Sequence, residues 1–127
     1  MGHAGGLLLT KTAVVTGLTQ GLSAALMRWR KPFATHDPGK IVSDLAIMLA
    51  LGGDCLADVA LLRSEPAVYG QVASDPTVSR LISTLAADAP RVLRAIDKAR
   101  AEARARAWAL AGEHAPNHGV TVERPLV

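Results

Sequence analysis

Apolar residues recur three and four positions apart through most of this chain, which is the spacing of one face of an α-helix. Five apolar residues after Gly17 follow this spacing, namely Leu18, Leu22, Ala25, Leu26 and Trp29. Prolines, glycines and short polar residues separate the apolar stretches and act as helix boundaries. The pattern therefore predicts helices over residues 7–15, 18–30, 38–51, 55–62, 67–69, 75–86 and 91–111.

Capping residues sharpen these boundaries. A side-chain cap followed by proline marks a helix start, because the cap accepts a backbone hydrogen bond and proline suits the first turn. We expect four residues to cap helix starts: Asp37, Asp54, Ser74 and Asp88. Gly17 and Gly52-Gly53 should end helices, and Gly112 should end the longest one in a left-handed conformation.

These elements predict an all-α fold, a compact multi-helix domain whose central helix, residues 38–51, is apolar nearly all round. Its expected core is Leu22, Leu26, Ile41, Leu45, Leu49, Leu56, Leu62, Leu81 and Leu85. The longest helix should turn six residues inward: Val92, Ala95, Ile96, Ala99, Ala103 and Ala107.

The last fifteen residues have a different character. Residues 113–119 are polar and contain Pro116 and Gly119, whereas residues 120–127 alternate like a strand. A single strand has no partner here and is not stable alone. We therefore expect a helical domain over residues 1–112, and a linker with the first-strand stub of a missing sheet over residues 113–127.

The composition says more about the cellular location of the protein than about its activity. The net charge of the 127 residues is +3, which permits nucleic-acid binding without requiring it. Cys55 is the only cysteine, so no internal disulfide can form. Since the sequence contains neither a signal peptide nor a membrane span, we expect a cytoplasmic protein with no membrane partner.

Residues 54–85 are typical of a helix-turn-helix-like segment, and the start of its last helix carries short hydroxyl residues and an arginine. DNA-reading helices place such residues at their N-terminus, near phosphates and base edges. The candidate DNA-binding residues here are Ser74, Thr77, Ser79 and Arg80. The alternative is a plain helical hairpin in which the hydroxyls cap the helix and Arg80 is solvated.

The helix predicted over residues 91–111 is rich in cations. Five of them are candidates to hold a phosphate backbone: Arg91, Arg94, Lys98, Arg100 and Arg104. The first three share one face and the last two share another. The alternative is a solvated polar face.

Residues suited to catalysis are not found in a defensible arrangement. Asp54 and Asp58 have the spacing of paired carboxylates, but acids in a first turn more commonly favour the helix dipole. His114 and His118 are separated by Pro116, which prevents a regular helix from presenting both. We expect no metal site, no catalytic residue and no small-molecule substrate.

Four stretches of the chain resemble the N-terminal region of DDE transposases from bacterial insertion sequences. These are residues 36–40 with the apolar helix after them, and residues 52–58, 73–81 and 109–116, the last continuing to the end of the chain. The resemblance implies that a ribonuclease-H-like domain follows, in which three acids hold two divalent metals such as Mg²⁺. The first acid should come soon after a segment similar to residues 124–127.

This resemblance implies a DNA-binding module of a transposase, truncated before its catalytic domain and inactive by itself. Its expected partner is DNA at the terminal repeats of the element, and homo-oligomerisation is left open. The alternative function is a helical assembly domain or a nonfunctional remnant of a truncated gene.

Overall fold

The computed structural model describes residues 3–114, and these form helices joined by turns and short connections. In chain order the elements are α1 (His3–Val15), α2 (Leu18–Ala25), the 3₁₀ turn η1 (Met27–Trp29), α3 (Pro38–Ala50), the 3₁₀ turn η2 (Leu56–Asp58), α4 (Val59–Arg63), α5 (Pro66–Tyr69), α6 (Asp75–Ala86) and α7 (Ala89–His114). The all-α prediction is confirmed for this part of the chain. The strand predicted over residues 120–127 and His118 lie outside the described residues.

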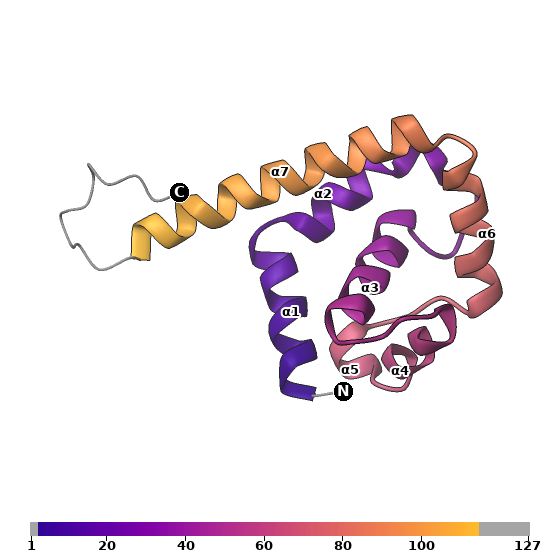
Figure 1. The fold of residues 1–127 in the computed structure, drawn as a ribbon, viewed down its shortest axis with the longest axis horizontal. Helices are drawn as coiled ribbons and strands as arrows, with labels where there is room; N and C mark the ends of the chain where they lie inside the picture. Colours follow the sequence, from indigo (N-terminus) through magenta and orange to yellow (C-terminus); the bar gives the residue numbers. More distant parts are fainter. Residues whose placement is uncertain (1–2, 115–127) are drawn as a thin grey trace.

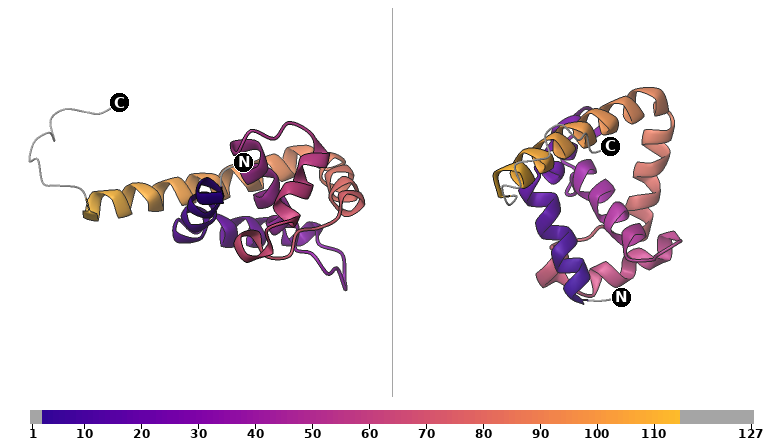
Figure 2. Two further views of the ribbon diagram at one scale, coloured as in Figure 1. Left: turned by 90° about the horizontal axis from the view of Figure 1, so that it is seen from below. Right: turned by 60° about the vertical axis from the view of Figure 1, so that its left-hand side comes forward.

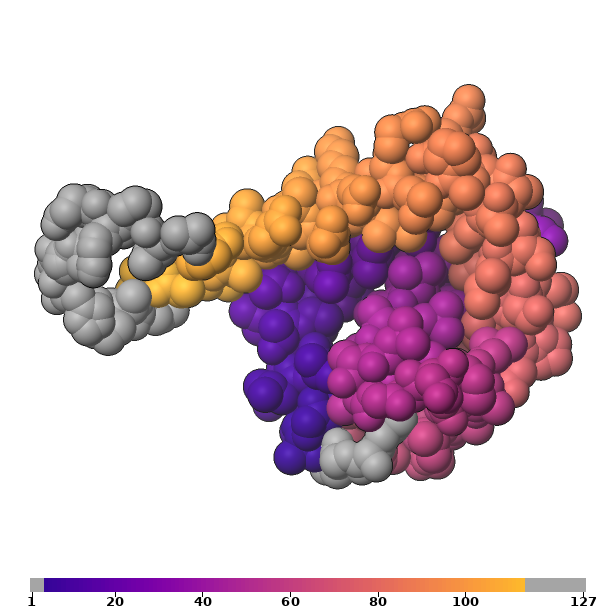
Figure 3. Space-filling view, viewed as in Figure 1, coloured from indigo at the N-terminus to yellow at the C-terminus, as the bar shows by residue number. Residues whose placement is uncertain are grey.

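Helix α3 occupies the centre, with α1 and α6 on opposite sides of it (Figures 1 and 2). Helix α7 packs along α2, and its C-terminal half extends past the other helices (Figures 1 and 3). No helix within residues 3–114 has the length and apolarity needed to cross a bilayer.

Two clusters of buried residues lie beside α3. The larger one contains Ile47, Met48, Val59, Leu62, Tyr69 and Val72, and the smaller one contains Ile41, Ala73 and Val78. Four of the predicted core leucines and isoleucines are buried: Leu22, Leu26, Ile41 and Leu62. Four others are half-buried: Leu45, Leu56, Leu81 and Leu85. The prediction is wrong for Leu49, which is 59% exposed.

Close helix contacts depend on glycine at two positions. A side chain on Gly39 would place its Cβ 2.3 Å from the Ser23 amide nitrogen, so α2 and α3 can cross here only because Gly39 lacks one. A Cβ on Gly6 would likewise clash with the Tyr69 hydroxyl. Helix α1 begins at His3, before the predicted start, and runs through Gly5 and Gly6.

The predicted helix over residues 18–30 is divided. Leu26 leaves the helical conformation at φ −99° and ψ 5°, and η1 follows α2 as a separate 3₁₀ turn. At the other end of the chain, α7 continues through Gly112 to His114, so the prediction that Gly112 ends the helix is wrong. By contrast, Gly17 ends α1 in the left-handed region, with φ 81°, as expected.

Candidate functional site

The start of α6 is fixed by two sets of contacts. Ser74 is the N-cap, as predicted, and its Oγ accepts a hydrogen bond from the Thr77 amide at 3.4 Å. Arg63 reaches across from α4, donating to the Ala73 carbonyl at 3.1 Å and pairing with the Asp75 carboxylate. The first turn of α6 is therefore held in a defined orientation relative to α4.

The four candidate DNA-binding residues at α6 are not equally available to contact a ligand. Ser74 donates to the Thr77 hydroxyl at 3.1 Å, and one Arg80 nitrogen donates to the same hydroxyl at 3.2 Å. The Ser74 hydroxyl thus caps the helix, and the Thr77 hydroxyl is occupied by two side-chain hydrogen bonds. Ser79 and Arg80 are exposed. Arginine carries five N–H donors, so Arg80 retains donors for a ligand.

A cleft of about 370 Å³ lies beside α6, between this helix and the connection from η1 to α3. In Figure 2 (left) this connection lies next to α6. The cleft brings Thr77 and Arg80 together with Arg30, Lys31 and His36. No carboxylate is among its lining residues, which leaves a surface with three permanent positive charges.

Sequence reasoning missed the cations that the connection contributes to this cleft. By position, Arg30 and Lys31 follow the apolar residues of the helix predicted over residues 18–30, where cations favour the helix dipole. In the structure they line the cleft, although Arg30 also donates to the Ala34 carbonyl at 2.9 Å and lies 3.8 Å from the Asp37 carboxylate. No periodic pattern could reveal this meeting of two distant segments.

The cations of α7 lie outside the cleft, and all five candidates are exposed. Two of them approach acids on their own helix or beside it: Arg91 lies 4.0 Å from Asp88, and Arg100 lies 3.2 Å from Asp97. Exposed pairs of this kind contribute little stability. The remaining three, Arg94, Lys98 and Arg104, form no ion pair with any residue in the described range.

The inner face of α7 matches its prediction. Val92, Ala99 and Ala103 are buried, and Ala95, Ile96 and Ala107 are half-buried. Arg106, a further cation of α7, donates from its Nε to the Val15 carbonyl at 3.0 Å. It therefore stabilises the C-terminus of α1, where carbonyls lack helical partners.

Asp88, the residue before α7, has a different role from the predicted one. Its backbone carbonyl accepts hydrogen bonds from the Arg91 and Val92 amides, both at 3.1 Å. Its carboxylate instead accepts a hydrogen bond from the Trp29 indole nitrogen at 3.0 Å. This bond connects η1 to the start of α7 and holds Trp29 at the edge of the cleft.

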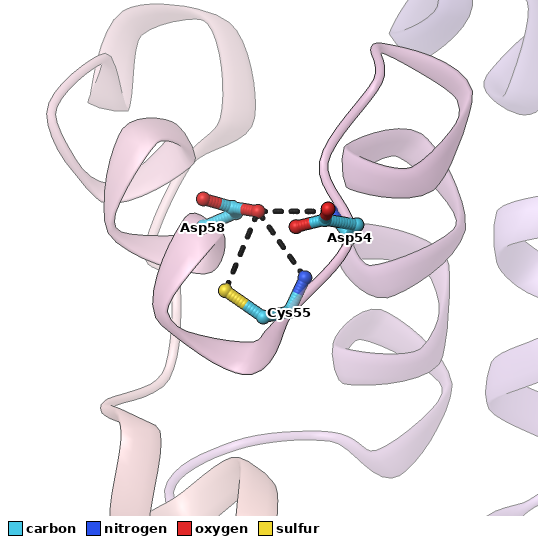
Figure 4. A group of neighbouring side chains, drawn as sticks. All are labelled: Asp54, Cys55 and Asp58. Atoms are coloured by element: carbon cyan, nitrogen blue, oxygen red, sulfur yellow. Dashed lines mark hydrogen bonds between the residues drawn. The ribbon is translucent and has the colours of Figure 1, made fainter.

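Asp54, Cys55 and Asp58 form the one cluster of acidic, cysteine or histidine side chains within residues 3–114 whose ligand atoms come close enough for a metal (Figure 4). Asp58 already accepts hydrogen bonds from the Asp54 amide at 2.8 Å and the Cys55 amide at 3.2 Å. These two amides, that of Asp54 first, hold the pKa of Asp58 below its ordinary value.

This arrangement caps the turn before α4. The predicted cap at Asp54 is wrong, because Asp58 supplies the accepting carboxylate and Asp54 supplies only its amide. The prediction that Asp58 favours a helix start is confirmed. A site for two hard divalent metals needs several free carboxylates, and this cluster offers two carboxylates, one of them engaged, beside a thiol.

Comparison with known proteins gives one family. No curated protein and no solved structure matches the chain. A protein-family model described as transposase DDE domain group 1 matches residues 1–123. Because the match extends over nearly the whole sequence and agrees with the resemblance seen at residues 36–40, 52–58 and 73–81, the chain belongs to the transposase DDE domain group 1 family.

Proposed function

We propose that the helical region of this transposase binds DNA, with α6 and the cleft beside it as the principal contact surface. The observation that carries the proposal is the meeting of Arg30 and Lys31 with Arg80 in a cleft that no carboxylate lines. Cations gathered in this way neutralise phosphates and release their counterions, which is the main source of affinity for DNA.

Within this surface, Arg80 is the residue suited to contact a base. Arg80 is exposed in the middle of α6, and an arginine fork can donate two hydrogen bonds to guanine in the major groove. Ser79 is exposed beside it. The cations of α7, in particular Arg94, Lys98 and Arg104, would add contacts to phosphates without regard to sequence.

The family implies two divalent metals for strand cleavage, and the described residues do not fit them. Three free carboxylates do not converge within residues 3–114, and the Asp54–Cys55–Asp58 cluster is engaged in capping. We therefore assign no catalytic residue here and propose that this helical region acts in recognition, the catalytic carboxylates being supplied elsewhere in the transposase.

Fluorescence anisotropy tests the DNA-binding proposal. Labelled duplexes from the ends of the element and a scrambled duplex are titrated across a salt series. Dissociation constants of roughly 10⁻⁴–10⁻⁶ M are expected for the scrambled duplex at physiological salt. Arg80→Ala should reduce the preference for the end sequence by about 1–3 kcal/mol. Arg104→Ala should weaken both duplexes equally and flatten the salt dependence.

Lys11→Ala is the control for loss of one positive charge, because Lys11 is exposed on α1, on the other side of α3 from α6. It should reduce the preference for the end sequence less than Arg80→Ala does, and it should reduce the affinity for both duplexes less than Arg104→Ala does. Absence of binding to either duplex at low salt would refute the proposal, and so would an Arg80→Ala variant that behaves like Lys11→Ala.

A second candidate function, helical assembly, is favoured by one observation. Trp108 is 70% exposed on the extending half of α7, and Leu93 is exposed on the same helix. Large exposed apolar side chains are common at protein interfaces. Sedimentation of the wild type and of Trp108→Ser decides this candidate: an oligomer that the substitution dissociates supports assembly, and a monomer at all concentrations excludes it.

A further inference from the structure

The cleft beside α6 has the dimensions of a ligand pocket. Its volume of about 370 Å³ lies within the range of roughly 300–1,000 Å³ that is typical of small-molecule sites. A double helix is too wide to enter such a space, so duplex binding on the surface of α6 does not account for the interior of the cleft.

The lining combines two kinds of chemistry. Its apolar part includes Trp29, Pro32, Ile41 and Leu81, which offer flat or branched surfaces to a ring. Its polar part consists of the cations already named, His36 and three threonines, Thr35, Thr77 and Thr84. A ligand that joins an aromatic ring to an anion satisfies both parts, since bases stack on aromatic side chains and phosphates accept from arginine and lysine.

Several of these groups are held in place before any ligand binds. The Trp29 indole is fixed by its hydrogen bond to Asp88, and the Arg28 guanidinium lies 5.3 Å from its ring centroid. Arg30 and Arg80 are each oriented by one internal hydrogen bond, to the Ala34 carbonyl and the Thr77 hydroxyl. Lys31 is exposed and forms no ion pair within residues 3–114.

We propose that this cleft binds one nucleoside phosphate, with the phosphate beside Arg30, Lys31 and Arg80 and the base against the apolar wall that includes Trp29. The nucleotide is either free or an unpaired nucleotide of a DNA strand. The second source rests on the proposed function, because it requires DNA to lie along α6, whereas the first does not.

Trp29 fluorescence tests the proposal in a Trp108→Phe background, which leaves Trp29 as the only tryptophan. The protein is titrated with thymidine 5′-monophosphate, with thymidine, with a single-stranded oligothymidylate and with a fully paired duplex. The monophosphate should change the emission saturably, and thymidine should bind at least fivefold more weakly because it lacks the anion. If the oligothymidylate competes with the monophosphate for the cleft, the natural ligand is a nucleotide of a DNA strand. If it does not compete, the natural ligand is a free nucleotide.

Two variants locate the binding site. Lys31→Gln should weaken the binding of the monophosphate at least threefold. Lys11→Gln removes one positive charge on α1 and should leave this binding unchanged. Ala34→Leu places a larger side chain in the lining and should abolish the emission change while circular dichroism remains unaltered. The proposal is overturned if no ligand gives a saturable change, or if Lys31→Gln and Ala34→Leu bind like Lys11→Gln.

Duplex anisotropy on the same variants separates this proposal from the DNA-binding function. Duplex binding with no response to monophosphate or oligothymidylate refutes the nucleotide site alone. A saturable response to monophosphate in a protein that binds no duplex refutes the DNA-binding function alone and assigns the cleft to a free nucleotide.

Discussion

Helices α3 and α6 both begin with a side-chain cap and a proline in the first turn. Asp37 accepts a hydrogen bond from the Lys40 amide at 2.9 Å, and Ser74 accepts one from the Thr77 amide at 3.4 Å. Beyond this start, their surroundings differ. Seven residues of α3 are buried, Ser43 and Asp44 among them, whereas Val78 is the one buried residue of α6.

The polar groups of the two helices differ in the same way. On α3, Asp44 pairs with Lys40 at 2.5 Å, and Asp37 also accepts a hydrogen bond from the Ser23 hydroxyl at 2.5 Å. Burial raises the pKa of Asp44, although the hydrogen bond and charge of Lys40 and the charge of His36 act in the opposite direction. On α6, Arg80 and Ser79 face solvent. The buried polar side chains of α3 are therefore structural, whereas Ser79 and Arg80 of α6 are accessible to a ligand.

The largest effect should come from one substitution made on both helices. Ile41 of α3 is 4% exposed and Ile82 of α6 is 45% exposed. Ile41→Ala should lower the free energy of unfolding by about 2–5 kcal/mol, because it removes buried atoms and leaves a cavity. Ile82→Ala should lower the free energy of unfolding by about 1 kcal/mol or less, since roughly half of the Ile82 surface is already exposed to solvent. Chemical denaturation measures both values, and equal losses would contradict the difference in burial.

A smaller effect is expected where α3 crosses α2. Gly39→Ala forces a methyl group against the backbone of Ser23 and should cost about 1–3 kcal/mol. Gly112→Ala is the matched control, because no atom lies within 4 Å of the added Cβ and alanine favours a helix by up to about 1 kcal/mol. Thermal unfolding should shift downward for the first variant and not for the second. A Gly39→Ala protein as stable as the wild type would refute the close crossing.

Local chemistry explains why part of this fold could be predicted. The capping by Asp37 and Ser74 and the left-handed turn at Gly17 involve only nearby backbone, so these roles can be inferred from a few residues of sequence. The orientation of α3 cannot be inferred from the sequence, because the helix is apolar nearly all round and several of its faces are equally suited to burial. In the structure Gly39 faces the backbone of Ser23, Asp44 is buried and Leu49 is exposed.

The candidate site divides in the same manner. Thr77 and Arg80 belong to one short stretch whose residue types indicate a DNA-contacting helix. Arg30 and Lys31 join them only through folding, since they precede α3 and meet α6 across the cleft. Sequence alone therefore singled out Thr77 and Arg80 as candidates, whereas the cleft that brings them together with Arg30 and Lys31 could not be predicted.

Site-directed crosslinking tests the central claim, that the exposed face of α6 lies against DNA, most directly. Cys55 is exposed and is the only cysteine, so Cys55→Ser gives a background without thiols. A single cysteine is then introduced by Ser79→Cys on α6 or by Leu8→Cys on α1. Both positions are exposed, and the two helices lie on opposite sides of α3. Each is labelled with a photoactivatable azide and irradiated with labelled duplex at low salt. If α6 lies against DNA, crosslinking should be strong from position 79 and weak from position 8; equal crosslinking from both positions, or more from position 8, would show that it does not.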